Sequence, residues 1–283
     1  MEHIGKLIFR LIAHGADAVP DPVRELIVRV CALVFYVFSP GQRKNVAENI
    51  SRTGRSATRS LVFGIFRLHT RNIIEMFSSS LWKNDRICGW FEFEGKDMLN
   101  RTLAEGKGAI LVTGHLGSWE LGALYLQALG YDLHVVAGVQ MNRLLTGAVK
   151  EAKEKRGIQV INPENSYRKL LKALASNAIV ALLVDGNIYT GGKELLFFDA
   201  PARVPDGPVR LAKASGAPII GAYCRRLGNS RCKLQLEAIM SAREVEVIPE
   251  REALDRVYGT VERFIGQNAD QWCMFRRFWG DAS

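Results

Sequence analysis

His115 and Glu120 are the two residues whose types and spacing point most directly to acid–base chemistry. The apolar run 109–112 before them has the pattern of a buried strand. Two glycines within residues 113–117 break that pattern and predict a tight turn. From Ser118 onward apolar residues recur at helical spacing, so Ser118 is expected to begin a helix. His115 is therefore predicted in a strand-to-helix turn, and Glu120 in the first turn of the helix.

This placement allows the two side chains to meet. On one continuous helix, residues five apart point roughly 140° away from each other. With His115 in the preceding turn, its ring can fold back to the Glu120 carboxylate. A carboxylate bound to one ring nitrogen selects the tautomer and leaves the other nitrogen free as a base. The alternative is a core histidine whose ring is satisfied by a nearby carboxylate.

The composition favours a globular protein with an anionic partner. Of 283 residues, 48% are hydrophobic, and the formal net charge is +9. Such a charge suits phospholipid headgroups, lipid phosphates, an acidic carrier protein or nucleic acid. The basic residues are dispersed rather than grouped in blocks, which argues against nucleic acid. The cysteine count of 5 is odd and no C-x-x-C pair occurs, so reduced thiols are expected, even for Cys224 and Cys232, which flank a predicted hairpin turn.

Residues 1–38 contain two amphipathic helical patterns, separated by prolines at 20 and 22. Apolar stripes flanked by basic residues are typical of helices that lie in a membrane interface. A helical hairpin packed on its own domain is the alternative. The apolar run 30–38 would span only about 15 Å as a helix, too short to cross a bilayer. No cleavable signal peptide is evident.

The remainder alternates predicted strands and helices. Strands are expected near 90–94, 109–113, 133–137, 158–161, 179–184, 194–198, 217–223 and 232–237. Helices are expected near 61–82, 96–104, 118–129, 143–156, 165–176, 206–215 and 250–268. This alternation predicts an α/β fold whose sheet is covered by helices on both faces.

A second candidate region follows the predicted strand 179–184. That strand ends at Asp185, which is either a functional carboxylate or a turn aspartate. Further on, Pro205-Asp206-Gly207-Pro208 opens a helix whose free N–H groups near Gly207 could hold an anion. Arg210 lies in the first turn of that helix.

Several of these segments resemble one family. His115-Leu-Gly-Ser-Trp-Glu120 matches the His-x4-Asp/Glu motif of the glycerolipid acyltransferases, and its surroundings are similar to the late acyltransferases of lipid A biosynthesis. The segment "RKNVAENI", the Asp185 loop, the helix opened by Gly207 and the terminal "QWCMFRRFW" are similar to further motifs of that family, in the same order. The resemblance spans roughly residues 40–280.

The resemblance implies a fold, a division of the chain and a reaction. The fold would be a mixed α/β sheet with helices on both faces, with an N-terminal membrane-associated segment over 1–58 and an acyltransferase domain over 59–283. His115, oriented by Glu120, would deprotonate an acceptor hydroxyl that attacks an acyl thioester, with no metal and no cofactor. The donor would be acyl carrier protein or acyl-CoA, and the acceptor a lipid A precursor at the cytoplasmic face of the bacterial inner membrane. Attachment to this anionic surface would be peripheral or monotopic.

The acceptor site is where the chain departs from its relatives. Family members commonly carry Arg-Pro after the strand that follows the catalytic helix, and this chain has Gly138-Val139. Arg143 or Arg156 could supply the missing phosphate contact, together with Asp185, Arg210 and Gly207 as substrate-binding residues.

Other functions stay open at this point. The acceptor could be a lysophospholipid, an aminolipid or a mannosylated lipid, or the protein could be a non-catalytic basic membrane-binding module. A zinc hydrolase lacks a convincing set of ligands, since His-x4-Glu is not H-E-x-x-H. A dinucleotide-binding enzyme lacks the G-x-G-x-x-G fingerprint.

Overall fold

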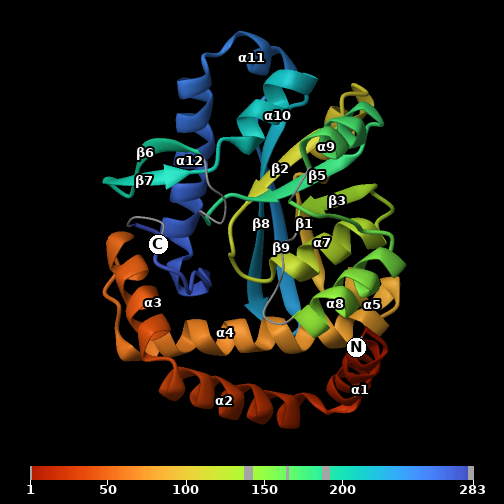
Figure 1. Ribbon diagram of the computed structural model, residues 1–283, viewed down its shortest axis with the longest axis vertical. Helices are drawn as coiled ribbons and strands as arrows, with labels where there is room; N and C mark the ends of the chain where they lie inside the picture. The colour runs from red at the N-terminus through yellow and green to blue at the C-terminus, as the bar shows by residue number, and fades with distance from the viewer. Residues whose placement is uncertain (1, 137–142, 164–165, 187–191, 280–283) are drawn as a thin grey trace.

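Strand β2, which leads into the His115 turn, lies inside a seven-stranded sheet formed by the described residues. The computed structural model describes residues 2–136, 143–163, 166–186 and 192–279. The sheet order is β1-β9-β8-β2-β5-β3-β4 (Figure 1). Strands β8, β2, β5, β3 and β4 run parallel, whereas β9 is antiparallel to β8 and β1 runs parallel to β9. The bounds are β1 Phe91–Glu94, β2 Ala109–Thr113, β3 Leu133–Val136, β4 Gln159–Ile161, β5 Ile179–Leu183, β8 Ile219–Gly228 and β9 Arg231–Met240.

Helices cover both faces of this sheet, as the sequence predicted (Figure 1). Alternate residues of β2 face opposite sides, because side chains of a strand alternate. Ile110 and Val112 join the core under α3, α4, α9, α10 and α12, while Ala109 and Leu111 join the core under α5, α6 and α7. The bounds are α3 Pro40–Arg52, α4 Arg59–Ser78, α5 Asn84–Cys88, α6 Lys96–Ala104, α7 Trp119–Ala128, α8 Arg143–Lys155, α9 Ser166–Ala175, α10 Gly207–Ser215, α11 Ala242–Val247 and α12 Glu250–Gln267.

Most predicted elements agree with the observed ones, but strand β7 (Ala200–Val204) and helices α3, α5 and α11 were not predicted. Strand β7 pairs with β6 (Lys193–Phe197) in a separate two-stranded sheet. Its run of five residues contains Pro201, which weakens a strand pattern. Helix α3 was missed because its segment is mostly polar and basic, and helices α5 and α11 were missed because they are too short to show a helical period. The five cysteines are free thiols, as expected.

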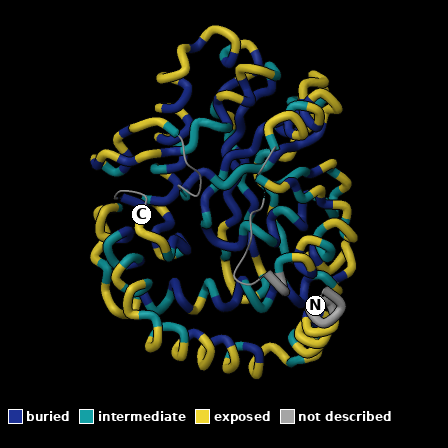
Figure 2. Tube along the Cα trace, in the orientation of Figure 1, coloured by how far each residue is buried: buried dark blue, intermediate teal, exposed yellow. Residues whose placement is uncertain are grey.

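Two further helices precede this unit. Helix α1 (Glu2–Ala18) packs against α4 and α8, and α2 (Asp21–Phe38) lies along α4 (Figure 1). Helix α2 buries Val28 and Ala32 toward the protein. Its outward side is apolar as well, and Figure 2 shows it exposed along the edge of the molecule. Among the described residues, no helix combines the length and apolar character needed to cross a membrane.

The C-terminal segment packs into the protein. Trp272, Phe278 and Trp279 are all buried. Asn49 of α3 donates from Nδ2 to the carbonyl oxygens of Met274 and Arg276, at 3.0 and 2.8 Å. The aromatic side chains at this end therefore belong to the core rather than to an exposed interface.

Candidate active site

His115 lies in the turn between β2 and α7, where the sequence predicted it. The side chain is 25% exposed, so it is partly accessible from solvent. The rings of His115 and Trp119 meet edge to face at 5.2 Å between centroids. The turn thus presents a partly exposed imidazole beside the Trp119 ring.

The ring of His115 is held by Asp185. Strands β2 and β5 are parallel neighbours with Thr113 opposite Leu183, so the residues two positions beyond each strand lie side by side. Nδ1 of His115 lies 2.8 Å from Oδ1 of Asp185, and the backbone N–H of His115 donates to Oδ2 at 2.6 Å. With the proton on Nδ1 bonded to this carboxylate, Nε2 is left as the basic nitrogen. Asp185, expected in substrate binding, is fully buried and contacts His115 instead.

Trp272 is the second partner of Asp185 and was not predicted as part of a site. Its indole Nε1 donates to Oδ2 of Asp185 at 2.8 Å. The segment around Trp272 also binds the turn itself, since Cys273 N donates to His115 O at 2.8 Å and Gly117 N donates to Gln271 O at 2.9 Å. The sequence shows the aromatic residue, but no local pattern indicates that a residue so distant in the chain contacts Asp185.

The pKa values of the pair shift in opposite directions. Burial alone would lower the pKa of His115, but the charge and the hydrogen bond of Asp185 outweigh it and raise that pKa above its usual value. Burial would raise the pKa of Asp185, but the charge and hydrogen bonds of His115, with the bond from Trp272, lower it. Asp185 is therefore ionised at neutral pH and stabilises a protonated His115.

Glu120, expected to orient His115, has a different partner. Its carboxylate forms an ion pair with Lys153 of α8 at 2.7 Å, and both side chains are largely buried. The orienting contact expected from Glu120 comes from Asp185, because the register of β2 and β5 places Asp185 at Nδ1. Glu120 still adds to the raised pKa of His115 through its charge.

A pocket lies beside the Glu120–Lys153 pair. It is lined by residues of α1, α4, α7 and α8 and by the residues that follow α4 and α8: Phe9, Met76, Ser80, Glu120, Leu124, Val149, Ala152, Lys153 and Arg156. Arg156, a predicted phosphate ligand, reaches this pocket but donates to the carbonyl oxygen of Trp82 and, at 2.9 Å, to Oδ1 of Asn84. Lys153, which the sequence did not single out, is the cation next to Glu120.

The remaining predicted ligands lie elsewhere or outside the described side chains. Arg210 is exposed on α10, with its guanidinium over the Tyr167 ring of α9 at 5.5 Å. Gly207 begins α10, and the preceding Pro205 accepts a hydrogen bond from the Tyr258 hydroxyl at 2.7 Å. The same hydroxyl donates to Val184 O at 3.3 Å, next to Asp185. Arg143 begins α8, and its side chain lies outside the described residues.

A second histidine lies near the turn. His69 of α4 packs its ring against Phe275 at 4.5 Å and Phe35 at 6.0 Å between centroids. Burial, assisted by the charge of His115, lowers the pKa of His69 to about 4. His69 is therefore neutral at physiological pH.

The turn depends on two glycines for its shape. A Cβ on Gly114 would lie 2.8 Å from Oδ2 of Asp185, so the absence of a side chain leaves room for the carboxylate. Gly117 has φ of +60° and its Cβ would lie 1.9 Å from the carbonyl oxygen of Cys224. That contact is closer than any real Cβ allows, and the backbone of β8 would have to move.

Replacing Gly117 with alanine should therefore destabilise the fold by more than about 2 kcal/mol, measured by chemical denaturation. Gly147→Ala is the matched control, because Gly147 lies within α8 and a Cβ added there would have no atom within 4 Å. There, alanine should stabilise by about 0.5–1 kcal/mol through its helix propensity. Equal stability of the two variants would mean that the turn adapts to a side chain.

The fold and the His115–Asp185 pair define an α/β protein with a histidine–aspartate pair at a strand-to-helix turn. The chain belongs to the bacterial lipid A biosynthesis acyltransferase family, whose model matches residues 5–280. It is 29% identical over 227 residues to the phosphatidylinositol mannoside acyltransferase of Mycobacterium tuberculosis (strain CDC 1551 / Oshkosh). The aligned region covers 79% of this chain and 60% of that protein. The protein of the same name from Mycolicibacterium smegmatis is 24% identical over 187 residues, covering 64% of this chain and 61% of that one. The chain thus spans about three fifths of the length of these relatives.

Proposed function

We propose that this protein transfers a fatty acyl group from an acyl thioester to a hydroxyl of a lipid acceptor, with His115 as the general base. The observation that carries the proposal is the contact of Nδ1 with a buried, ionised Asp185, which leaves Nε2 basic in a partly exposed turn. Membership of an acyltransferase family supports the reaction class.

In the proposed reaction, Nε2 of His115 accepts the proton of the acceptor hydroxyl as its oxygen bonds to the thioester carbonyl carbon. Asp185 stabilises the resulting imidazolium, in the way that the aspartate of a serine hydrolase triad does. The tetrahedral intermediate collapses with cleavage of the carbon–sulfur bond, and the thiolate takes the proton back from Nε2. Atoms and charge balance without any further reactant. Acyl carrier protein or acyl-CoA is the proposed donor.

The proposed acceptor is a hydroxyl of a phosphate-bearing glycolipid. The family name refers to lipid A, and the relatives are named for phosphatidylinositol mannoside. A phosphate-bearing glycolipid would suit a chain of net charge +9. Purified protein incubated with labelled acyl carrier protein and a panel of acceptors tests this. Mass gain by a lipid A precursor or by a phosphatidylinositol mannoside supports the proposal and separates the two, and acylation of a lysophospholipid alone would contradict it.

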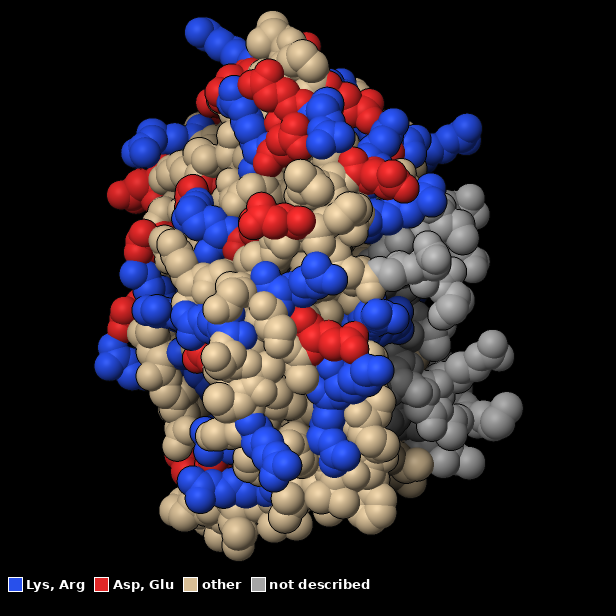
Figure 3. Space-filling model, turned by 90° about the vertical axis from the view of Figure 1, so that its left-hand side faces the viewer, with Lys and Arg blue, Asp and Glu red and all other residues tan. Residues whose placement is uncertain are grey.

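We further propose that α1 and α2 attach the protein to the cytoplasmic face of the bacterial inner membrane. Apolar side chains at least 40% exposed line both helices: Leu7, Ile8, Leu11, Ile12, Val23, Leu26, Ile27, Val30, Leu33, Val34, Val37 and Phe38. A contiguous exposed apolar face of this kind indicates an interaction surface. In the face seen in Figure 3, side chains of Lys and Arg outnumber those of Asp and Glu toward the lower end, where α2 lies in Figure 1. An apolar face beside cations suits an anionic bilayer.

Leu26→Glu combined with Leu33→Glu should weaken binding to anionic vesicles by about 100-fold, because each leucine contributes about 1.5 kcal/mol or more when buried. Vesicle flotation measures this directly. Leu196→Glu is the control, since Leu196 is 65% exposed but lies on β6. For the wild type, high salt should release only part of the protein and detergent all of it. Equal binding by all three proteins would contradict the attachment.

A further inference from the structure

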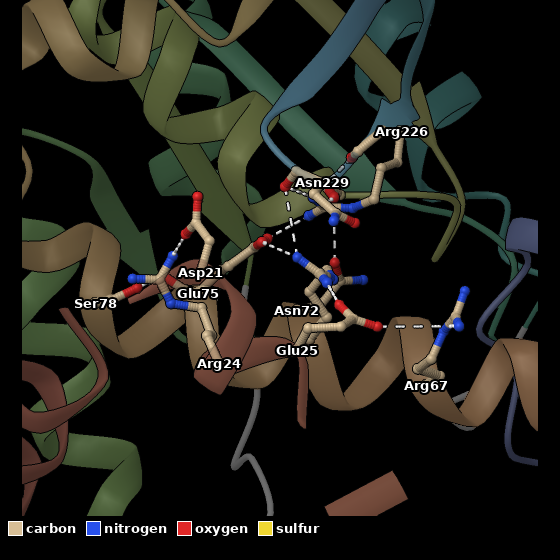
Figure 4. A network of polar contacts seen from close by, with 12 residues as sticks. Asp21, Arg24, Glu25, Arg67, Asn72, Glu75, Ser78, Arg226 and Asn229 are labelled. Atoms are coloured by element: carbon tan, nitrogen blue, oxygen red, sulfur yellow. Dashed lines mark hydrogen bonds and ion pairs between the residues drawn. The ribbon is translucent and has the colours of Figure 1, made fainter. Parts of the chain in front are cut away.

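A buried network of charged and polar side chains, which includes Asn72, Glu75 and Arg226, connects α4 to β8 (Figure 4). Glu75 of α4 is 1% exposed and forms an ion pair with Arg226 of β8. Arg226 also donates from Nη2 to the hydroxyl of Ser118 at 2.6 Å. The guanidinium therefore joins a buried carboxylate to the residue that directly precedes α7.

The turn is bound at this point by a closed set of hydrogen bonds. The Ser118 hydroxyl accepts from Arg226 and donates to Oδ1 of Asn72 at 3.1 Å. Nδ2 of Asn72 donates to the carbonyl oxygen of Gly117 at 2.6 Å. The backbone N–H of Ser118 donates to Cys224 O at 2.9 Å. The Ser118 hydroxyl and the Asn72 side-chain amide each both accept and donate a hydrogen bond. These bonds can all form together in only one orientation of the turn.

The network extends from Glu75 to helix α2. Arg71 lies one helical turn before Glu75, with 3.7 Å between Nη1 and Oε1. Arg71 also forms an ion pair with Glu25 of α2, and Arg67 lies 3.9 Å from the same carboxylate. Side chains thus connect the helix with the exposed apolar face to the turn that carries His115.

The energetics of burial argue against a purely stabilising role for these charges. A buried ion pair contributes little net stability, because desolvation offsets the attraction between the charges. A role in fixing one geometry accounts better for a carboxylate and a guanidinium placed this deeply. Catalysis is sensitive to that geometry, since a displacement of about 1 Å can cost about 100-fold in rate.

We propose that Glu75 and Arg226 form a positioning pair that holds the His115 turn through Ser118 and ties it to α2 through Arg71 and Glu25. The inference rests on the proposed role of His115 as the base. Neither Glu75 nor Arg226 is assigned contact with substrate. Their effect is to fix where Nε2 lies relative to the acceptor.

Arg226→Lys and Ser118→Ala test the pair. In the wild type, Nη2 of Arg226 bonds both Glu75 and Ser118 while Nη1 donates to the carbonyl oxygen of Asn229 at 3.0 Å. Lysine keeps the charge but loses this planar two-nitrogen geometry, and alanine at position 118 removes only the hydroxyl. In both variants kcat should fall by about 10- to 100-fold while KM for the acyl thioester stays near wild type. The acidic limb of the pH profile of kcat/KM should stay at the wild-type pH, because the contact between His115 and Asp185 that sets the His115 pKa is intact. Hydrogen exchange of the Gly117 and Ser118 amides should accelerate by about tenfold or more.

Matched controls separate positioning from general destabilisation. Arg231 begins β9, on the same hairpin as Arg226, and forms an exposed ion pair with Glu92 of β1. Arg231→Lys should therefore alter neither kcat nor the exchange of the Gly117 and Ser118 amides. Glu25→Gln should accelerate hydrogen exchange of the Gly117 and Ser118 amides by about threefold. Unchanged exchange would show that α2 does not help to hold the turn.

Folded Ser118→Ala protein with wild-type kcat and wild-type exchange would overturn the positioning pair, even if Arg226→Lys failed to fold. A lowered melting temperature with unchanged kcat would do the same, because it would show a structural role only. If the wild-type protein turns over no thioester, the proposed function fails, and exchange in Ser118→Ala alone then decides whether the network holds the turn.

Discussion

His115→Gln is expected to lower acyl transfer by about 10⁴-fold, the upper end of what a general base contributes. Glutamine can still donate to Asp185 but has no basic nitrogen at the position of Nε2. His115→Ala should be equally inactive. It should also be less stable, because it leaves the fully buried Asp185 carboxylate with one bond fewer. The measurement is single-turnover transfer from a labelled acyl thioester.

The glutamine variant serves as the folding control for this experiment. Its circular dichroism and melting temperature should match the wild type, so that lost activity reports lost chemistry. A folded His115→Gln protein that transfers acyl groups at rates near wild type would rule out His115 as the base.

Asp185→Asn is expected to lower kcat by about 10³–10⁴-fold while the protein stays folded. An asparagine amide can stabilise the tautomer with its proton on Nε2, and the same replacement in a serine hydrolase triad costs about 10⁴-fold for this reason. The pH dependence should shift as well. Burial lowers the pKa of His115 and Asp185 raises it, so loss of the carboxylate charge lowers that pKa. The acidic limb of kcat/KM should move to lower pH, since His115 then stays unprotonated to a lower pH.

Glu120→Gln provides the comparison, because Glu120 pairs with Lys153 and acts on His115 only through its charge. A loss of about tenfold or less is expected. NMR titration of the His115 ring would follow both variants. If Glu120→Gln cost more activity than Asp185→Asn and shifted the His115 pKa further, Glu120 would be the orienting carboxylate after all.

Local patterns predicted most of the elements that carry the site. The apolar run ending at Thr113, the glycine-containing turn and the helical spacing after Ser118 placed His115 where the structure has it. The strand that ends just before Asp185 was equally visible. These predictions succeeded because strand and helix periods are set by neighbouring residues, whatever the rest of the chain does.

The partner of His115, in contrast, depends on which strands are neighbours. A spacing of five residues permits a contact with Glu120, but nothing local requires it. Asp185 lies 70 positions from His115 and reaches the ring because β5 pairs in parallel with β2. Trp272 and Arg226 come from still more distant segments and complete the surroundings of the turn. Such contacts arise from the packing of whole elements against one sheet, and no residue type or spacing near His115 specifies them.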